Sequence, residues 1–119
     1  MLPSMDYVKL LPHINVEEGK NRVMNNMALY LKLLVKFKGR EMAENLIEAA
    51  KNNNHAVVAQ EAHAIRGTAA NLSFPTLDKI SSEIEALAKT NESCLHLTDS
   101  LLDAITSLEL AINELDGAE

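Results

Sequence analysis

Aromatic residues, cysteine, glycine and proline are all scarce in this sequence of 119 residues, and tryptophan is absent. Four glycines and three prolines are too few for the many turns of an all-β fold. A single cysteine, Cys94, excludes an internal disulfide and a cysteine-rich zinc site. The side chains left to build a core are Leu, Ile, Val, Met and Ala, which favour packed helices.

Positive charge is also in deficit, since the formal net charge is −6. No stripe of Lys and Arg is present that could bind the phosphates of a nucleic acid, so we expect no nucleic-acid partner. No apolar run approaches the ~18 residues of a membrane span, and the N-terminus lacks the basic start and apolar core of a signal peptide. We therefore expect a cytoplasmic protein without membrane contact, and we also expect it to be a monomer.

Apolar residues recur at steps of three and four along most of the chain, as in amphipathic helices. The helix from 55 to 72, for example, places Val58, Ala62, Ile65 and Ala69 on one side. Asn and Gly residues and Pro75 mark the helix ends. The pattern predicts helices over 16–24, 27–39 (ending at Gly39), 40–51, 55–72, from Pro75 to about 89, and 94–115.

The connections between these helices are short, so that neighbouring helices should run antiparallel. The predicted fold is all-α: an antiparallel up-down four-helix bundle with one or two short extra helices at the N-terminus. We expect residues 1–119 to form a single domain, which suits their number.

The stretch "AQEAHAIRGTAANLS" (59–73) carries the clearest candidate site. With Ala62 and Ile65 facing the core, His63 falls on the outer side of its helix. Four small residues lie within about 40° of it on the helical wheel: Ala56, Ala59, Gly67 and Ala70. A glycine costs about 1 kcal/mol in a helix interior. The pattern therefore indicates an imidazole that stands on a bare surface, accessible to another protein.

Gln60 and Arg66 flank His63 at about 60° to either side. A neutral imidazole is a good nucleophile near pH 7, and a phosphoryl group on it would be stabilised by the neighbouring guanidinium. The residues thus suit a histidine that carries phosphate. No G-x-x-x-x-G-K-[ST] motif and no kinase glycine loop is present, so we expect no ATP site in this chain.

The segment "AHAIRGTAANL" resembles the histidine-containing phosphotransfer (Hpt) family, whose pattern is A-H-x-[LI]-K-G followed by small residues. The segments "INVEEGKNRVMNNMALYLKLLVKF" and "TLDKISSEIEAL" are similar to the family's flanking helices, so the resemblance covers roughly residues 14–90. Two residues depart from the pattern: Arg66 stands in place of the usual lysine and Ser73 in place of a frequent glycine.

The resemblance implies that His63 accepts phosphoryl from the aspartyl phosphate of a receiver domain and returns it to another. Those receivers would belong to a hybrid sensor histidine kinase and to a response regulator, and the required Mg²⁺ would be theirs. The chain itself would then be a carrier without a cofactor. The alternative is a helical adaptor, or a degenerate module that binds a receiver without transfer.

Three further features have competing interpretations. The helix from 27 is apolar nearly all round. One interpretation is that the helix is deeply buried. The other is that Leu29 and Leu33 are exposed and form apolar surface for a docking partner. The acidic "EIE" at 83–85 is interpreted as a solvated face. The other histidines (His13, His55 and His96) are interpreted as solvated residues, since the E-x-x-H pairs of di-iron bundles are missing.

Overall fold

The computed structural model describes residues 7–118, and this part of the chain is helical with no strand. Six α-helices and two short 3-10 helices follow one another in these residues: η1 (Tyr7–Leu10), α1 (Val16–Asn21), α2 (Met27–Val35), α3 (Gly39–Lys51), α4 (His55–Leu72), α5 (Pro75–Lys89), η2 (Leu95–Leu97) and α6 (Thr98–Ala118). The predicted all-α class is confirmed.

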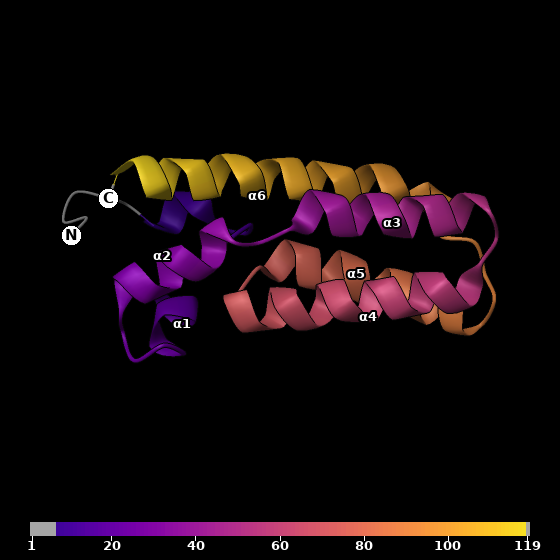
Figure 1. Ribbon diagram of the computed structural model, residues 1–119, viewed down its shortest axis with the longest axis horizontal. Helices are drawn as coiled ribbons and strands as arrows, with labels where there is room; N and C mark the ends of the chain where they lie inside the picture. The colour runs from indigo at the N-terminus through magenta and orange to yellow at the C-terminus, as the bar shows by residue number, and fades with distance from the viewer. Residues whose placement is uncertain (1–6, 119) are drawn as a thin grey trace.

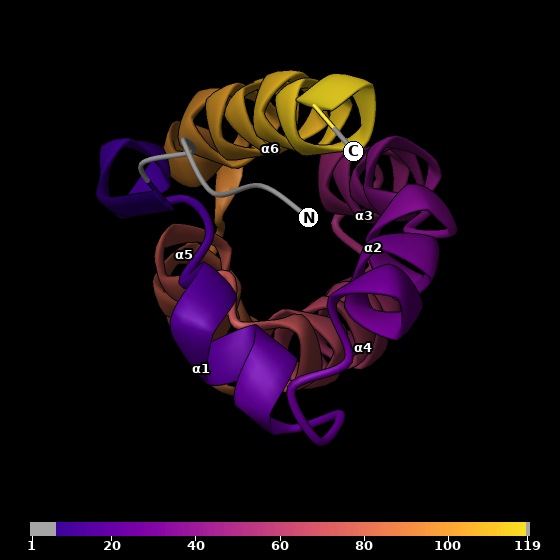
Figure 2. The same cartoon turned by 90° about the vertical axis from the view of Figure 1, so that its left-hand side faces the viewer.

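Helices α3, α4, α5 and α6 lie side by side along the long axis and alternate in direction (Figure 1). Seen from one end, they surround a common interior, with α1 and α2 at the end nearest the viewer (Figure 2). The molecule is correspondingly elongated, at 47 × 23 × 20 Å. This is the expected four-helix bundle with two short N-terminal helices.

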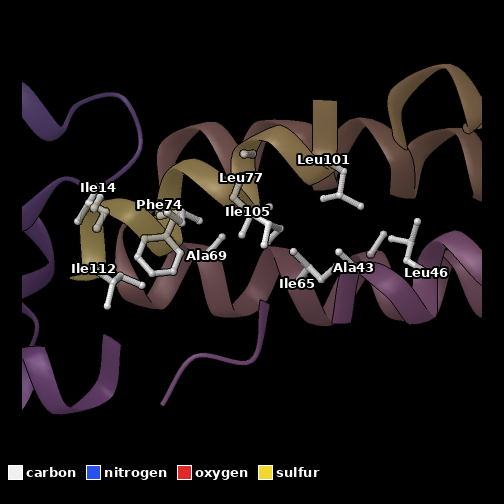
Figure 3. Close-up of a cluster of buried hydrophobic side chains, with 14 of the residues drawn as sticks. Ile14, Ala43, Leu46, Ile65, Ala69, Phe74, Leu77, Leu101, Ile105 and Ile112 are labelled. Carbon is white, nitrogen blue, oxygen red and sulfur yellow. The ribbon is translucent and has the colours of Figure 1, made fainter. Parts of the chain in front are cut away.

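The core is aliphatic, as the composition requires. Ile65 and Ala69 of α4, Leu77 of α5 and Ile105 of α6 point into the shared interior (Figure 3), and all four are fully buried. Burying a side chain of the size of Leu or Ile stabilises the fold by about 1.5–3 kcal/mol. The same burial fixes which face of α4 turns outward.

Residues at both ends of α4 set its limits. The Asn54 Oδ1 accepts a hydrogen bond from the Val57 N–H at 3.3 Å and so caps the first turn. At the other end Ser73 adopts a left-handed conformation with φ of 63°, where glycine is common, and Pro75 is the first residue of α5. Helices α4 and α5 therefore form a tight hairpin around Ser73 and Phe74.

The N-terminal helices are fixed to the C-terminal end of α4. The buried Tyr30 hydroxyl of α2 donates to the Leu72 carbonyl at 2.6 Å, and burial raises the pKa of this phenol. Gly19 of α1 lies so close to the Tyr30 ring that a Cβ there would collide with it. The Arg22 guanidinium donates to the Ser73 Oγ at 2.8 Å. Helix α2 is thus held beside the last turns of α4.

The prediction that the second helix ends at Gly39 is wrong. Helix α2 ends at Val35, and Gly39 is the first residue of α3. A Cβ at Gly39 would collide with the Phe37 ring and the Ile105 side chain, so this glycine allows a close approach at the corner between two helices. Its role is packing and not helix capping.

Three other boundaries differ from the sequence prediction. Helix α1 stops at Asn21 and not at 24. Residues 95–97 form the 3-10 helix η2 before α6 begins at Thr98, and α6 ends at Ala118 and not at 115. The predicted helices over 55–72 and from Pro75 to about 89 agree with α4 and α5.

In residues 7–118 no helix combines the length and the apolar character needed to cross a membrane.

Candidate functional site

His63 occupies the middle of α4, on the side that faces away from the core. Its side chain is 67% exposed, whereas Ala62 before it and Ile65 after it are fully buried. The outward position predicted from the helical wheel is confirmed. The imidazole can be reached from solvent without any movement of the fold.

The surface around His63 is bare, as predicted. Ala56, Gly67 and Ala70 are exposed, and Ala59 is half-buried. A Cβ built at Gly67 would meet no side chain or neighbouring element within 4 Å. Gly67 is therefore not a packing contact, and this face of α4 is open to a partner.

A carboxylate from the neighbouring helix lies against the histidine. The Glu85 Oε2 of α5 is 3.0 Å from the His63 Nδ1, and the Arg66 Nε donates to the Glu85 Oε1 at 2.8 Å. The Lys89 Nζ lies 3.3 Å from the Glu85 Oε2. One carboxylate thus joins the imidazole to two cations.

Glu85 is buried, with only 8% of its side chain exposed, so the interpretation of "EIE" as a solvated face is wrong for this residue. Burial by itself raises the pKa of the Glu85 carboxyl. The hydrogen bonds from Arg66, His63 and Lys89 outweigh burial, and the pKa lies below its ordinary value. Glu85 is therefore ionised near neutral pH and presents a fixed negative charge to the imidazole.

Two groups compete for the same ring nitrogen. The Arg66 Nη2 also lies 3.0 Å from the His63 Nδ1. A protonated Nδ1 can donate to Glu85 but cannot accept from Arg66, whereas an unprotonated Nδ1 can do only the reverse. The tautomer of His63 therefore decides which of the two contacts is a hydrogen bond.

Arg66 is less exposed than a free surface residue, with 38% of its side chain accessible. Gln60, on the other flank of His63, is exposed, and its side chain makes no hydrogen bond within the described residues. The structure brings Arg66 into the cluster with His63 and Glu85 but leaves Gln60 outside it.

Leu29 and Leu33 lie on α2 and are 41% and 38% exposed. The interpretation of this helix as deeply buried holds for Tyr30, Leu31 and Leu34 but not for these two leucines. The apolar surface that the sequence offered as a docking site is present on α2.

Sequence reasoning missed Glu85, although a signal for it exists. His63 lies eleven residues before Phe74 and Glu85 eleven residues after it. Helices rise equally per residue, so in a hairpin that turns at Phe74 these two residues stand at the same height. Ser81 and Ala88, on the same side of α5 as Glu85, are buried with it.

Neither a curated protein nor a solved structure matches this chain. The family model of the Hpt domain matches residues 35–118, which run from the end of α2 to the end of α6 and include His63, Arg66 and Glu85. That range is well over half of the 119 residues. Hpt domains are phosphoryl carriers of phosphorelays, and the chain belongs to the Hpt domain family.

Proposed function

We propose that His63 accepts a phosphoryl group from the aspartyl phosphate of one receiver domain and passes it to another. The first receiver would belong to a hybrid sensor histidine kinase and the second to a response regulator. The observation that carries the proposal is the exposed imidazole, bound to a buried carboxylate at Nδ1 and surrounded by small residues.

The transfer forms one bond and breaks one. The lone pair of the His63 Nε2 attacks phosphorus, and the bond between phosphorus and the aspartyl oxygen breaks. The aspartate leaves as a carboxylate and the phosphoryl group stays on Nε2. The reverse sequence on the second receiver regenerates free His63. No nucleotide and no metal site in this chain is required, and the Mg²⁺ would be held by the receivers.

Glu85 favours the tautomer that this chemistry needs. If Nδ1 were unprotonated, its lone pair would face the Glu85 Oε2 at 3.0 Å, and a buried ionised carboxylate would lose a donor. Protonated Nδ1 donates to Glu85 instead, which leaves the lone pair on the exposed Nε2. The same carboxylate offsets the positive charge that develops on the ring as the nitrogen–phosphorus bond forms.

Arg66 would serve the phosphoryl group. Its Nε is engaged by Glu85, but its Nη groups lie beside the ring and retain hydrogens directed at no carboxylate among the described residues. A guanidinium in this position stabilises the charge of the phosphoryl oxygens. Gln60 could donate from the opposite flank, since its amide is exposed.

The receiver would dock on the open face of α4. Ala59, Gly67 and Ala70 leave space for its acidic site to approach the imidazole. Leu29 and Leu33 would extend this contact onto α2. We propose that the chain acts as a monomer in the cytoplasm.

The direct test incubates the wild type and its variants with phosphorylated receiver domains and follows the transfer of label. The His63→Gln variant should take up no label and keep its helical circular dichroism spectrum. The matched control is His55→Gln, which removes another histidine of α4 and should be labelled normally. Label on His63→Gln would exclude His63 as the acceptor. A wild type that binds the receiver without taking up label would support the adaptor instead.

A further inference from the structure

A groove opens between α2 and α4, on the side of α4 away from Glu85. Its volume is about 600 Å³, and its apolar walls include Leu33, Phe37 and Met42. Three cations, Arg22, Lys36 and Lys38, line it together with apolar and neutral polar residues, and no carboxylate does. The groove is thus an apolar hollow with a basic rim.

The cations of this rim lie in a segment of the chain that is rich in Lys and Arg and lacks Asp and Glu. Residues 19–40 contain six Lys and Arg and no Asp or Glu. The other residues contain the remaining five cations and all 17 carboxylates. A chain that is acidic overall therefore carries one strongly basic segment, and α2 lies within it.

Half of these six cations are compensated by carboxylates. Lys20, Arg22 and Arg40 form ion pairs with Glu17, Glu18 and Glu109 respectively. The other three, Lys32, Lys36 and Lys38, are exposed and lie within 4 Å of no carboxylate oxygen in residues 7–118. Asp116 lines a smaller hollow beside Lys32 and Lys36 without forming an ion pair with them. The positive charge of α2 and the segment after it is left for another molecule.

The groove continues the surface around His63. Thr68 and Asn71 of α4 line it, and Gly67 lies next to Thr68 on the open face. Leu33 belongs both to the groove and to the exposed apolar surface of α2. A protein that covers His63 across Gly67 therefore reaches the groove without leaving the surface of α4.

We propose that the groove receives an apolar side chain from an acidic face of the protein that exchanges phosphoryl with His63. Lys32, Lys36 and Lys38 select that partner by its carboxylates. This inference rests on the proposed function and adds to it the charge of the partner. Complementary charge steers association and rejects partners of the wrong sign, with effects of 10- to 1,000-fold on association rates.

An anionic membrane is the other surface that unpaired lysines could meet. The observations favour a protein, because the groove is concave and accommodates a projecting side chain. The carboxylates outside residues 19–40 exceed the cations there by twelve, and they would oppose the approach of an anionic bilayer.

The test reverses the charge of the rim. Lys36→Glu/Lys38→Glu is compared with Lys51→Glu/Lys79→Glu, a double variant of equal charge whose exposed lysines lie on α3 and α5. The probes are phosphorylated receiver domains, phosphoramidate as a small phosphoryl donor, and phosphatidylserine vesicles. We expect the rim variant to lose at least about tenfold in kcat/KM for transfer from the receiver at low ionic strength. The loss should shrink at high ionic strength, and labelling by phosphoramidate should be unchanged.

The outcomes separate this inference from the proposed function. Equal transfer rates in the two double variants, or sedimentation of the wild type but not the rim variant with the vesicles, would overturn the acidic-partner proposal. A wild type that phosphoramidate labels on His63 but that no receiver domain binds would overturn it too, with His63 still an acceptor. Failure of phosphoramidate to label His63 would count against the proposed function itself.

Discussion

The two flanks of His63 on α4 differ in almost every respect. Toward α5 the side chains are charged and close together, since the Glu85 carboxylate contacts Arg66, Lys89 and the imidazole. Toward α2 they are small or apolar, and Lys36 and Lys38 near them lie within 4 Å of no carboxylate oxygen among residues 7–118. We infer a division of work: the paired flank prepares the nucleophile, and the open flank receives the partner.

Two phosphoryl donors can test the roles of the two flanks separately. Phosphoramidate is small and needs only the nucleophile, whereas a receiver domain needs both the nucleophile and the docking surface. Changes on the paired flank should slow labelling by both donors. Changes on the open flank should slow only the receiver.

The largest effect is expected at Glu85. Glu85→Gln removes the charge that fixes the Nδ1 proton, and a hydrogen bond to a charged group contributes about 1.5–3 kcal/mol. Labelling by either donor should fall by about 10- to 100-fold. Glu83→Gln, an exposed residue two positions earlier on α5, is the matched control and should behave as wild type. A normal rate in Glu85→Gln would show that the carboxylate is only structural.

Gly67 tests the open flank. No neighbour lies within 4 Å of a Cβ at this position, so Gly67→Gln should leave the melting temperature nearly unchanged. Its longer side chain, one turn from His63, should reduce transfer from the receiver by about tenfold or more and leave labelling by phosphoramidate intact. Normal transfer from the receiver in a folded variant would mean that the partner docks elsewhere.

Arg66 is expected to have an intermediate effect. Arg66→Ala should make the phosphohistidine less stable and slow both donors, because it removes the cation beside the ring. It should also raise the pKa of Glu85, which loses its principal donor. Arg66→Lys keeps the charge and should be close to wild type, so an equal loss in both variants would show that the guanidinium geometry matters more than the charge.

Acid should destabilise the paired flank through Glu85. The folded pKa of Glu85 is lower than its ordinary value of 4.5, so its pairing stabilises the fold above that value. This contribution is lost as the pH falls below 4.5 through the folded pKa. Urea unfolding measures the free energy of unfolding at several pH values across this range. That free energy should fall less with acid in Glu85→Gln than in wild type. The same pH dependence in both proteins would contradict the pairing.

The smallest expected change is a gain. Gly67→Ala should raise the free energy of unfolding by about 0.5–1 kcal/mol, because alanine is the better helix former and the site is open. Urea unfolding at neutral pH measures it. A loss of stability would show that Gly67 contacts another element after all.

The sequence predicted the two helices that position the site because their signals are local. Each of these signals involves residues within one or two helical turns: Asn54 before α4, Pro75 at the start of α5, and the spacing of apolar residues by three and four. Gly39 was misread because a glycine between two helices fits the end of one as well as the start of the next. The side chains that a Cβ at Gly39 would meet are placed by the folded chain: Phe37 is near in sequence, but Ile105 lies 66 residues away.

Glu85 was missed for a related reason. A helical wheel shows how residues share a face of one helix but not which neighbour that face meets. Only the hairpin around Phe74 places Glu85 at the height of His63. Likewise the excess of cations over residues 19–40 can be counted in the sequence, but which of them lie near a carboxylate depends on packing.

The central claim is that Nε2 of His63 is the acceptor atom, with Nδ1 protonated and bound to Glu85. Two-dimensional ¹H–¹⁵N spectra of the imidazole rings, recorded with ¹⁵N-labelled histidine before and after phosphoramidate treatment, test it without any partner. We predict a protonated Nδ1 on His63 in the free protein and phosphorus bonded to Nε2 afterwards. Phosphorus on Nδ1, or phosphorylation of another histidine in place of His63, would contradict the claim.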